Sequence, residues 1–185
     1  MTGLKLHIPD ELFAEAESSS FNGLYELETL KVGSDTYTFD KPLPYDLFIS
    51  NTGNALLISG TVQGVGECQC ARCLEPASVS VRGEVEEYIL LSDSREAADD
   101  PDEEYEVLPE DHIIDLAPIL SAALILDLPL IPLCKEDCEG LCSTCGANLN
   151  EGPCGCQAQP DDDFETNPFA VLKNYSFDNT DETSE

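Results

Sequence analysis

The residues best suited to chemistry in this sequence are its nine cysteines, which fall into three groups. The spacing within the groups is Cys68-x-Cys70-x2-Cys73, Cys134-x3-Cys138-x3-Cys142-x2-Cys145 and Cys154-x-Cys156. A Cys-x-x-Cys turn presents two thiolates to one metal ion, and zinc takes four thiolates in a tetrahedron. The sequence therefore predicts metal binding, with buried free thiols, disulfides and an iron–sulfur cluster as the alternatives.

Eight of these cysteines are enough for two sites with four thiolates each. The first site is expected to use Cys70, Cys73, Cys134 and Cys138, and the second Cys142, Cys145, Cys154 and Cys156. The alternative is a single ribbon-like site of Cys70, Cys73, Cys142 and Cys145, and Cys68 is the expected non-ligand. Gly146 follows Cys145 and can adopt the positive φ that such a turn requires. Because four thiolates leave no open coordination position, two Zn2+ ions held in this way would be structural.

The charge of the chain restricts its partners. Eight Lys and Arg residues face 38 Asp and Glu residues, which gives a formal charge of −30. Proteins that grip phosphate backbones or anionic membranes need basic surfaces, so this balance argues against both roles. It favours a basic protein partner, or it is a habitat adaptation of the surface with no specific partner.

The sequence also indicates a reducing compartment. The most apolar stretch, residues 116–126, has eleven residues, whereas a membrane span needs about 20. The N-terminal residues carry no apolar run behind a basic start, so no secretory signal is expected. A cytoplasmic location is therefore predicted, and in reducing cytoplasm cysteines bind metals more often than they form disulfides.

Alternating apolar and polar residues predict that residues 4–91 are mainly β-structure. Strands are expected at 4–8, 25–32, 36–39, 45–50, 54–67 and 77–91, with a helical turn within 9–20. The last two would form a hairpin with the first cysteine group at its tip. Residues 92–112 are predicted to form a solvated acidic loop, since ten acids there face one arginine.

A helix is predicted at residues 116–127, with Asp115 as its N-cap and Pro129 and Pro132 beyond its end. Its apolar residues lie on all sides, which indicates a buried helix. The predicted fold class is α+β, a mainly antiparallel β-sheet with one buried helix and a Cys-rich, zinc-stapled C-terminal module. The expected parts are a β domain (1–133), a zinc module (134–156) and an acidic tail (157–185) with an NPFAVL segment.

No catalytic constellation is found in the sequence. The two histidines, His7 and His112, have no neighbours that suggest a triad or a metal site, and no phosphate-binding glycine loop is present. A thioredoxin-like role for Cys70 and Cys73 would require a βαβ context, whereas a hairpin is expected here. The chain is therefore predicted not to be an enzyme.

Four segments in the same order resemble the YceD-like family, the large ribosomal RNA subunit accumulation proteins. They are CARCLEP (70–76), DLAPILSAALILDLPLIPLC (115–134), CKEDCEGLCSTCGANLN (134–150) and NPFAVLKN (167–174). The resemblance implies a bacterial cytosolic or plastid factor that large-subunit ribosomal RNA needs in order to accumulate, without a known enzymatic reaction. It also implies that the eight cysteines assigned above are metal ligands.

Two functional hypotheses follow. In the first, the acidic surface holds a basic large-subunit ribosomal protein or pre-ribosomal particle, and the apolar residues Pro168, Phe169, Val171 and Leu172 form a docking motif, unless they fold back onto the chain's own sheet. In the second, the protein contacts ribosomal RNA precursor directly in a zinc-dependent manner. The candidate cations for RNA contact are Arg72, Arg82 and Lys135.

Overall fold

The computed structural model describes residues 3–91 and 106–156. Most of the predicted acidic loop, the predicted tail at 157–185 and the docking residues Pro168, Phe169, Val171 and Leu172 lie outside the described residues. The chain divides into two compact units, Met1–Gly140 and Leu141–Glu185. Within the described ranges, no helix combines the length and the apolar character that crossing a membrane requires.

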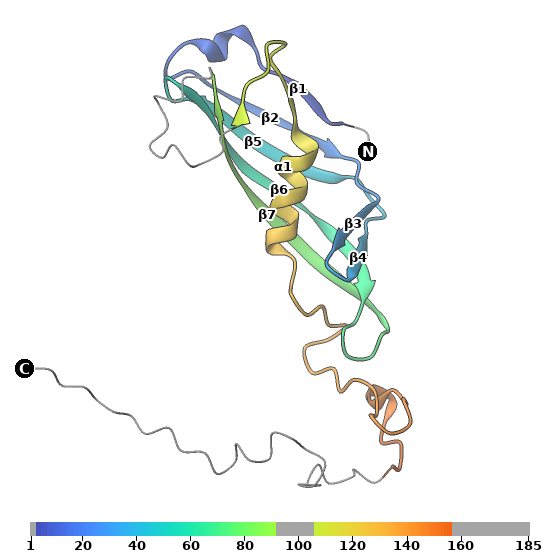
Figure 1. Cartoon of the computed structure of the whole chain (residues 1–185). Coiled ribbons are helices and arrows are strands. Elements are labelled where there is room, and N and C mark those ends of the chain that lie inside the picture. Colours follow the sequence, from blue (N-terminus) through green and yellow to red (C-terminus); the bar gives the residue numbers. More distant parts are fainter. Residues whose placement is uncertain (1–2, 92–105, 157–185) are drawn as a thin grey trace, which may run out of the picture. The chain divides into compact units, whose positions relative to one another are not determined.

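The first unit is built on a seven-stranded sheet in which only one strand pair is parallel. Its main path has the order β2-β5-β6-β4-β3, while β7 pairs with β6 and with the short β8. The strands are β2 (Ser18–Tyr25), β3 (Thr29–Val32), β4 (Asp35–Thr38), β5 (Leu43–Asn51), β6 (Ala55–Gln69), β7 (Pro76–Leu90) and β8 (Glu106–Val107). A separate two-stranded sheet joins β1 (Lys5–His7) to β9 (Ile113–Asp115). Figure 1 shows the long strands side by side.

The hairpin of β6 and β7 is the longest feature of the fold. Its two 15-residue strands pair without interruption from Ala55 opposite Leu90 to Gln69 opposite Pro76. Side chains alternate between the faces, so that Val62, Val81 and other apolar residues are buried on one side. A slip of one residue would expose this whole set, and the buried face therefore fixes the register of the hairpin tip.

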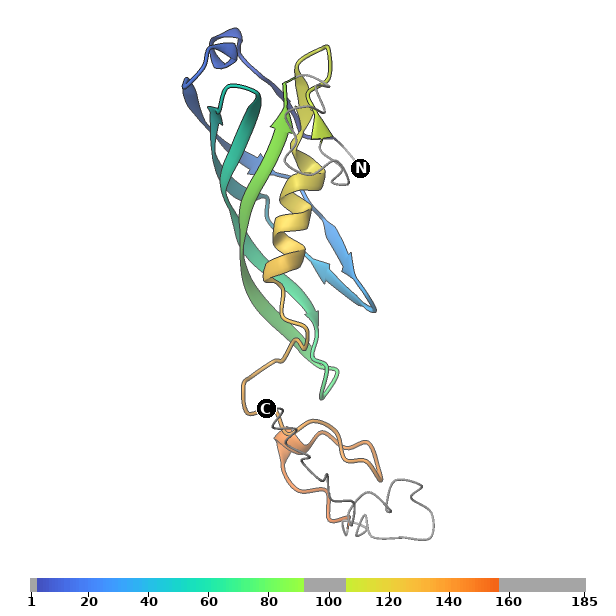
Figure 2. The ribbon, with the colours of Figure 1, turned by 60° about the vertical axis from the view of Figure 1, so that its left-hand side comes forward.

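Helix α1 (Leu116–Asp127) covers the inner face of β7 and β6 (Figure 2). The predicted N-cap is confirmed, since the Asp115 carboxylate accepts a hydrogen bond from the Ala117 N–H at 3.0 Å. Leu120 and Leu124 are fully buried. The expectation that the helix is buried on all sides is wrong, because Leu126 is 86% exposed. Because a single helix packs on this sheet, the sheet buries one face of the helix and the opposite face remains exposed to solvent.

The expected strand at residues 25–32 is also wrong as a single element. β2 ends at Tyr25 and β3 begins at Thr29. β2 itself starts in a serine-rich stretch at Ser18 and pairs with β5 along its full length. The helical turn expected within residues 9–20 is a 3-10 turn, η1 (Asp10–Phe13).

The last residue of α1 also satisfies a backbone N–H group at the edge of β7. The Asp127 carboxylate accepts a hydrogen bond from the backbone N–H of Arg82 at 2.7 Å. The first compact unit extends through Gly140. Cys134 and Cys138 belong to this unit because their thiols lie beside those at the tip of the hairpin.

The close packing of α1 on β7 depends on Gly83. A Cβ atom at this position would lie 2.5 Å from the carbonyl carbon of Ala123. We expect Gly83→Ala to lower the free energy of unfolding by about 1–3 kcal/mol, because the helix backbone must move to admit the methyl group. Chemical denaturation measures the change. Ser80→Ala, on the exposed face of the same strand, is the control, and an equal effect of both variants would contradict this packing argument.

Candidate metal centres

The first cysteine group starts in the turn that joins β6 to β7. The Cys70 N–H donates to the carbonyl of Glu75 at 2.8 Å, and the Leu74 N–H donates to the carbonyl of Cys70 at 3.0 Å. The Arg72 N–H points at the Cys70 sulfur at 3.5 Å. The turn therefore directs the thiols of Cys70 and Cys73 to one side and supplies N–H groups to the first of them.

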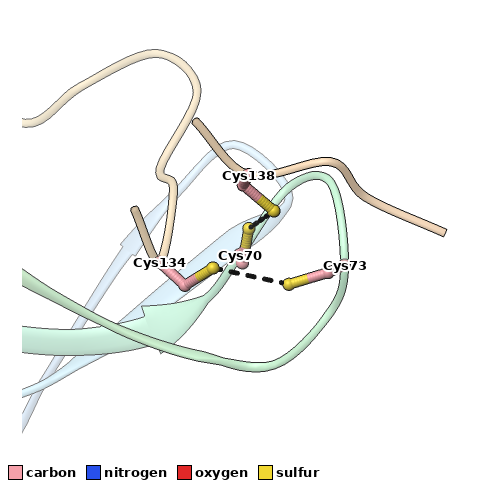
Figure 3. A group of neighbouring side chains, drawn as sticks. All are labelled: Cys70, Cys73, Cys134 and Cys138. Carbon is pink, nitrogen blue, oxygen red and sulfur yellow. Dashed lines mark hydrogen bonds between the residues drawn. The ribbon is translucent and has the colours of Figure 1, made fainter. Parts of the chain in front are cut away.

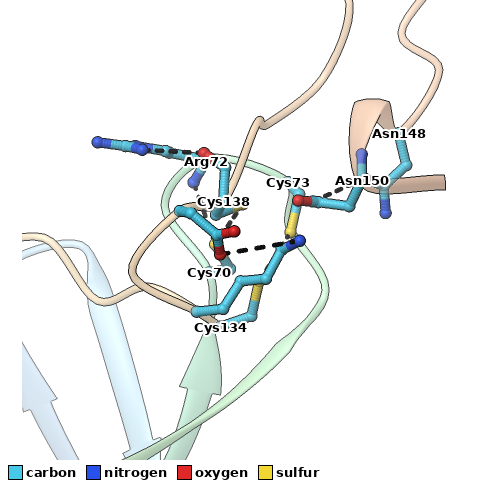
Figure 4. Close-up of polar contacts among 9 residues, drawn as sticks. Cys70, Arg72, Cys73, Cys134, Cys138, Asn148 and Asn150 are labelled. Atoms are coloured by element: carbon cyan, nitrogen blue, oxygen red, sulfur yellow. Dashed lines mark hydrogen bonds and ion pairs between the residues drawn. The ribbon is translucent and has the colours of Figure 1, made fainter. Parts of the chain in front are cut away.

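The chain that follows α1 runs back to this turn. The Ala71 N–H donates to the carbonyl of Pro132 at 2.8 Å, which aligns the two backbones just before Cys134. The Arg72 guanidinium donates from Nη1 to the carbonyl of Cys138 at 2.9 Å (Figure 4). These two contacts hold the second pair of cysteines opposite the first pair, although more than 60 residues separate the pairs in sequence.

The four sulfurs of the first group meet in a compact cluster (Figure 3). The Cys70 and Cys138 sulfurs are 3.7 Å apart, the Cys73 and Cys134 sulfurs are 3.6 Å apart, and all four lie within 4.8 Å of one another. A tetrahedron with metal–sulfur distances of 2.3 Å has edges of about 3.8 Å. A disulfide would need about 2.05 Å. The cluster therefore has the dimensions of a single-ion site.

The second group lies entirely in the second unit and consists of Cys142, Cys145, Cys154 and Cys156, whose sulfurs lie within 4.8 Å of one another. The Cys142 N–H donates to the carbonyl of Ala147, and the Gly146 N–H donates to that of Cys142, each at 2.8 Å. As predicted, Gly146 has a positive φ, 73°. A short 3-10 turn, η3 (Leu149–Glu151), follows, capped by Asn148, whose side chain accepts from the Asn150 N–H (Figure 4).

The two groups differ in exposure. In the first, Cys70, Cys73 and Cys138 are buried and Cys134 is exposed. In the second, Cys145 and Cys156 are exposed, while Cys142 and Cys154 are half-buried. The described part of the second unit, 141–156, contributes no residue to the hydrophobic core. Side-chain packing alone therefore gives this segment little stability, and a bound ion would supply most of it.

The thiols of the first group differ widely in acidity. Burial alone would raise the pKa of Cys70, but hydrogen bonds from backbone N–H groups, those of Cys73 and Cys134 foremost, lower it to about 6. Cys134 is an exposed residue, but desolvation of its sulfur among the other thiols, together with hydrogen bonding to those thiols, raises its pKa to about 12. One thiolate thus forms readily in this group, and further thiolates beside it are costly unless a cation compensates their charge.

The second group repeats this pattern. Backbone N–H groups of Cys145 and Thr144 lower the pKa of Cys142 to about 6. Hydrogen bonding with the thiols of Cys145 and Cys154 raises the pKa of Cys156 to about 12. In both groups the acidic thiol is the first cysteine of a Cys-x-x-Cys turn, because that turn aims successive N–H groups at its sulfur.

The structure brings the eight cysteines together as two sets of four, one set in each unit. Cys68 lies apart, buried, with its sulfur 3.7 Å from the carbonyl oxygen of Ala77. Burial raises the pKa of this thiol.

Each of the three cations suggested for RNA contact makes a contact within the first unit. Arg72 donates to the carbonyl of Cys138, and Lys135 lies 3.9 Å from Asp137 in an exposed ion pair. Arg82 lies on β7, with its backbone N–H bonded to Asp127. The Ala71–Pro132 hydrogen bond, which aligns the first centre, was not foreseen, because a backbone contact between distant segments leaves no sequence signal.

Comparison with known proteins shows which family the chain belongs to. The family model of the large ribosomal RNA subunit accumulation protein YceD matches residues 58–175, which is more than half of the chain and includes both groups of four cysteines. The chain belongs to the YceD family. The resemblance noted in the sequence is thereby confirmed.

Curated relatives come from mycobacteria. The uncharacterized proteins Mb2951c of Mycobacterium bovis and Rv2926c of Mycobacterium tuberculosis are each 35% identical over 126 residues, which cover 66% of this chain and 60% of the relative. The uncharacterized protein ML1660 of Mycobacterium leprae is 32% identical over 111 residues, 58% of this chain and 49% of the relative. The chain thus spans at most 60% of the length of these relatives. No solved structure matches it.

The two clusters predict a stoichiometry of two ions per chain. Native mass spectrometry of the full chain prepared with zinc should show two ions. Cys73→Ser and Cys154→Ser should each retain one, because each removes a thiolate from a different cluster. Cys68→Ser is the matched control and should retain two. A single ion in the unaltered chain, lost in both Cys73→Ser and Cys142→Ser, would instead support the ribbon-like site.

Metal binding should also release protons. The pKa of Cys134 and of Cys156 is raised to about 12, so each cluster holds a thiol that is protonated at pH 7 and must lose its proton when an ion binds. Affinity therefore rises with pH and falls as the pH drops through 7 towards 6. Calorimetry in buffers of different ionisation enthalpy counts the protons. Affinity independent of pH between about 6 and 8 would contradict thiolate ligation.

Proposed function

We propose that this YceD-family chain is a non-enzymatic, cytoplasmic ribosome-biogenesis factor. It supports the accumulation of large-subunit ribosomal RNA by binding a basic ribosomal protein of the large subunit, and two structural zinc ions maintain its fold. The family match carries the ribosomal role. The mode of action rests on the charge of the chain, 38 acids against eight Lys and Arg residues.

Zinc is the ion that best suits the two cysteine clusters. Each offers four sulfur ligands, and a tetrahedral all-sulfur set selects zinc or iron over magnesium and calcium. In an iron–sulfur cluster the four thiolates are distributed over two or more iron atoms, which would spread them beyond the 4.8 Å within which all four sulfurs of each group lie. Structural zinc contributes about 10–16 kcal/mol in small zinc-binding peptides, enough to order a segment without an apolar core.

Protein contact is favoured over RNA contact by the way the described cations are used. Of the three candidates for RNA binding, Arg72 is engaged by the carbonyl of Cys138, and the charge of Lys135 is offset by Asp137 in an exposed ion pair. Zinc does not reverse the charge, because one divalent ion on four thiolates leaves each cluster at −2. A ribosomal protein that binds RNA carries a basic surface. Before assembly, an acidic surface can bind that basic surface through complementary charge.

A pull-down from lysate tests this mechanism directly. Tagged full chain is recovered at low salt with and without RNase, and the bound molecules are identified. We expect one basic large-subunit protein to remain bound after RNase and to dissociate as salt rises from about 50 to about 300 mM. Ribosomal RNA precursor that disappears with RNase would favour direct RNA contact. The absence of ribosomal components from both samples would contradict the proposed mode of action.

The cellular role has its own test. In cells that lack the protein, the ratio of large-subunit to small-subunit ribosomal RNA should fall. Re-expression of the unaltered chain or of Cys68→Ser should restore it, whereas Cys73→Ser should not, because the first centre is then incomplete. An unchanged ratio of large-subunit to small-subunit ribosomal RNA in the deletion strain would contradict the proposed role in ribosomal RNA accumulation.

A further inference from the structure

Apolar side chains gather on the surface where α1 ends and the chain turns towards the first cysteine cluster. Nine large apolar residues are exposed in the described part of the chain, and four of them fall within seven positions. We call this set the apolar ridge: Ile125, Leu126, Leu130 and Ile131, which are 40%, 86%, 98% and 63% exposed. Single exposed apolar residues are common, but four within seven positions of the sequence are a concentration that is typical of an interaction surface.

The backbone beneath the ridge is fixed at both ends. On one side Leu128 is buried, and the Tyr37 hydroxyl reaches the carbonyl of Pro129 at 3.4 Å. On the other side the carbonyl of Pro132 accepts the Ala71 N–H at 2.8 Å. Leu130 and Ile131 lie between these anchors and therefore cannot turn into the core without breaking them. Such a surface is ordered before a partner arrives, which reduces the entropic cost of binding.

The first cysteine cluster forms part of this support. Cys134 follows the anchor at Pro132 by two residues, and its sulfur lies 3.6 Å from that of Cys73. One acid, Asp127, lies within the segment of the ridge, and three more follow the segment at Glu136, Asp137 and Glu139. Residues 127–140 contain four acids and one lysine, a formal charge of −3, and the cluster adds −2 when it holds a divalent ion. An apolar surface bordered by negative charge is complementary to an amphipathic segment rich in Lys and Arg.

We propose that the apolar ridge is the docking site for a basic amphipathic segment of a protein partner. Apolar side chains of that segment cover Leu130 and Ile131, and its cations face the surrounding acids. This inference rests on the proposed function, because it gives the basic partner a point of attachment. It assigns that attachment to the described residues at the end of α1.

A defined peptide tests the ridge without knowledge of the partner. The probe is a fluorescent peptide of about 18 residues made of leucine and lysine, with the leucines on one helix face, and its scrambled form has the same composition. Fluorescence anisotropy with the zinc-loaded full chain gives the affinity. We expect the double variant Leu130→Ser/Ile131→Ser to bind about tenfold more weakly, since two buried apolar contacts are lost.

The matched control is Leu24→Ser/Phe48→Ser. These side chains, on β2 and β5, are 60% and 46% exposed, so the control removes the same kind of surface elsewhere. It should leave the affinity unchanged, and the scrambled peptide should bind the unaltered chain more weakly than the amphipathic one. Equal affinity of both double variants and the unaltered chain would overturn the proposal, because binding would then depend on net charge alone.

Two other occupants are distinguishable in the same samples. If a second copy covers the ridge, sedimentation shows self-association that only Leu130→Ser/Ile131→Ser abolishes. If another part of the same chain covers it, that variant lowers the melting temperature but leaves the peptide affinity unchanged. Either result would overturn the proposal. Failure of the unaltered chain to retain a basic ribosomal protein would contradict the proposed function alone, since the peptide measurement does not depend on it.

Discussion

The first unit depends on a link between two segments that are distant in sequence. Cys70 and Cys73 lie at the tip of the longest hairpin, and Cys134 and Cys138 lie beyond the only α-helix of the described residues. A metal ion on these four sulfurs would close a loop of more than 60 residues and so lower the conformational entropy of the unfolded chain. The same link constrains the path of the chain after α1, and hence the position of the apolar ridge.

The chain has a formal charge of −30, and ionised thiols in the cysteine clusters add further negative charge. Each cluster contains one thiol that ionises near pH 6 and one whose pKa rises to about 12. Four thiolates are therefore mutually unfavourable until a cation joins them. A bound metal ion would supply positive charge to a chain that has few cations of its own, and we therefore expect the stability of the fold to depend on metal supply and on pH.

Local signals in the sequence predicted the parts of the fold that depend on neighbouring residues. The Cys-x-x-Cys turns, the Asp115 cap and the bounds of α1 were found because each depends on residues a few positions apart. The start of β2 at Ser18 was missed because pairing with β5, rather than the propensity of its serines, makes it a strand. The choice between two cysteine clusters and one ribbon-like site stayed open, since spacing does not show which distant pairs meet. The partial exposure of α1 could not be predicted either, because the composition of a helix does not show how many of its faces pack against other elements.

The contact between Asp127 and the edge of β7 bears on how the protein behaves at high concentration. An edge strand offers backbone groups that can pair with another molecule and start aggregation. On β7, β8 pairs only with Ile89 and Leu90, and farther along the strand the Asp127 carboxylate occupies the N–H of Arg82. A carboxylate at this position both takes a hydrogen-bond donor and repels an acidic second copy. The last residue of the helix thus makes one backbone group at the edge of β7 unavailable for pairing with a strand of another molecule.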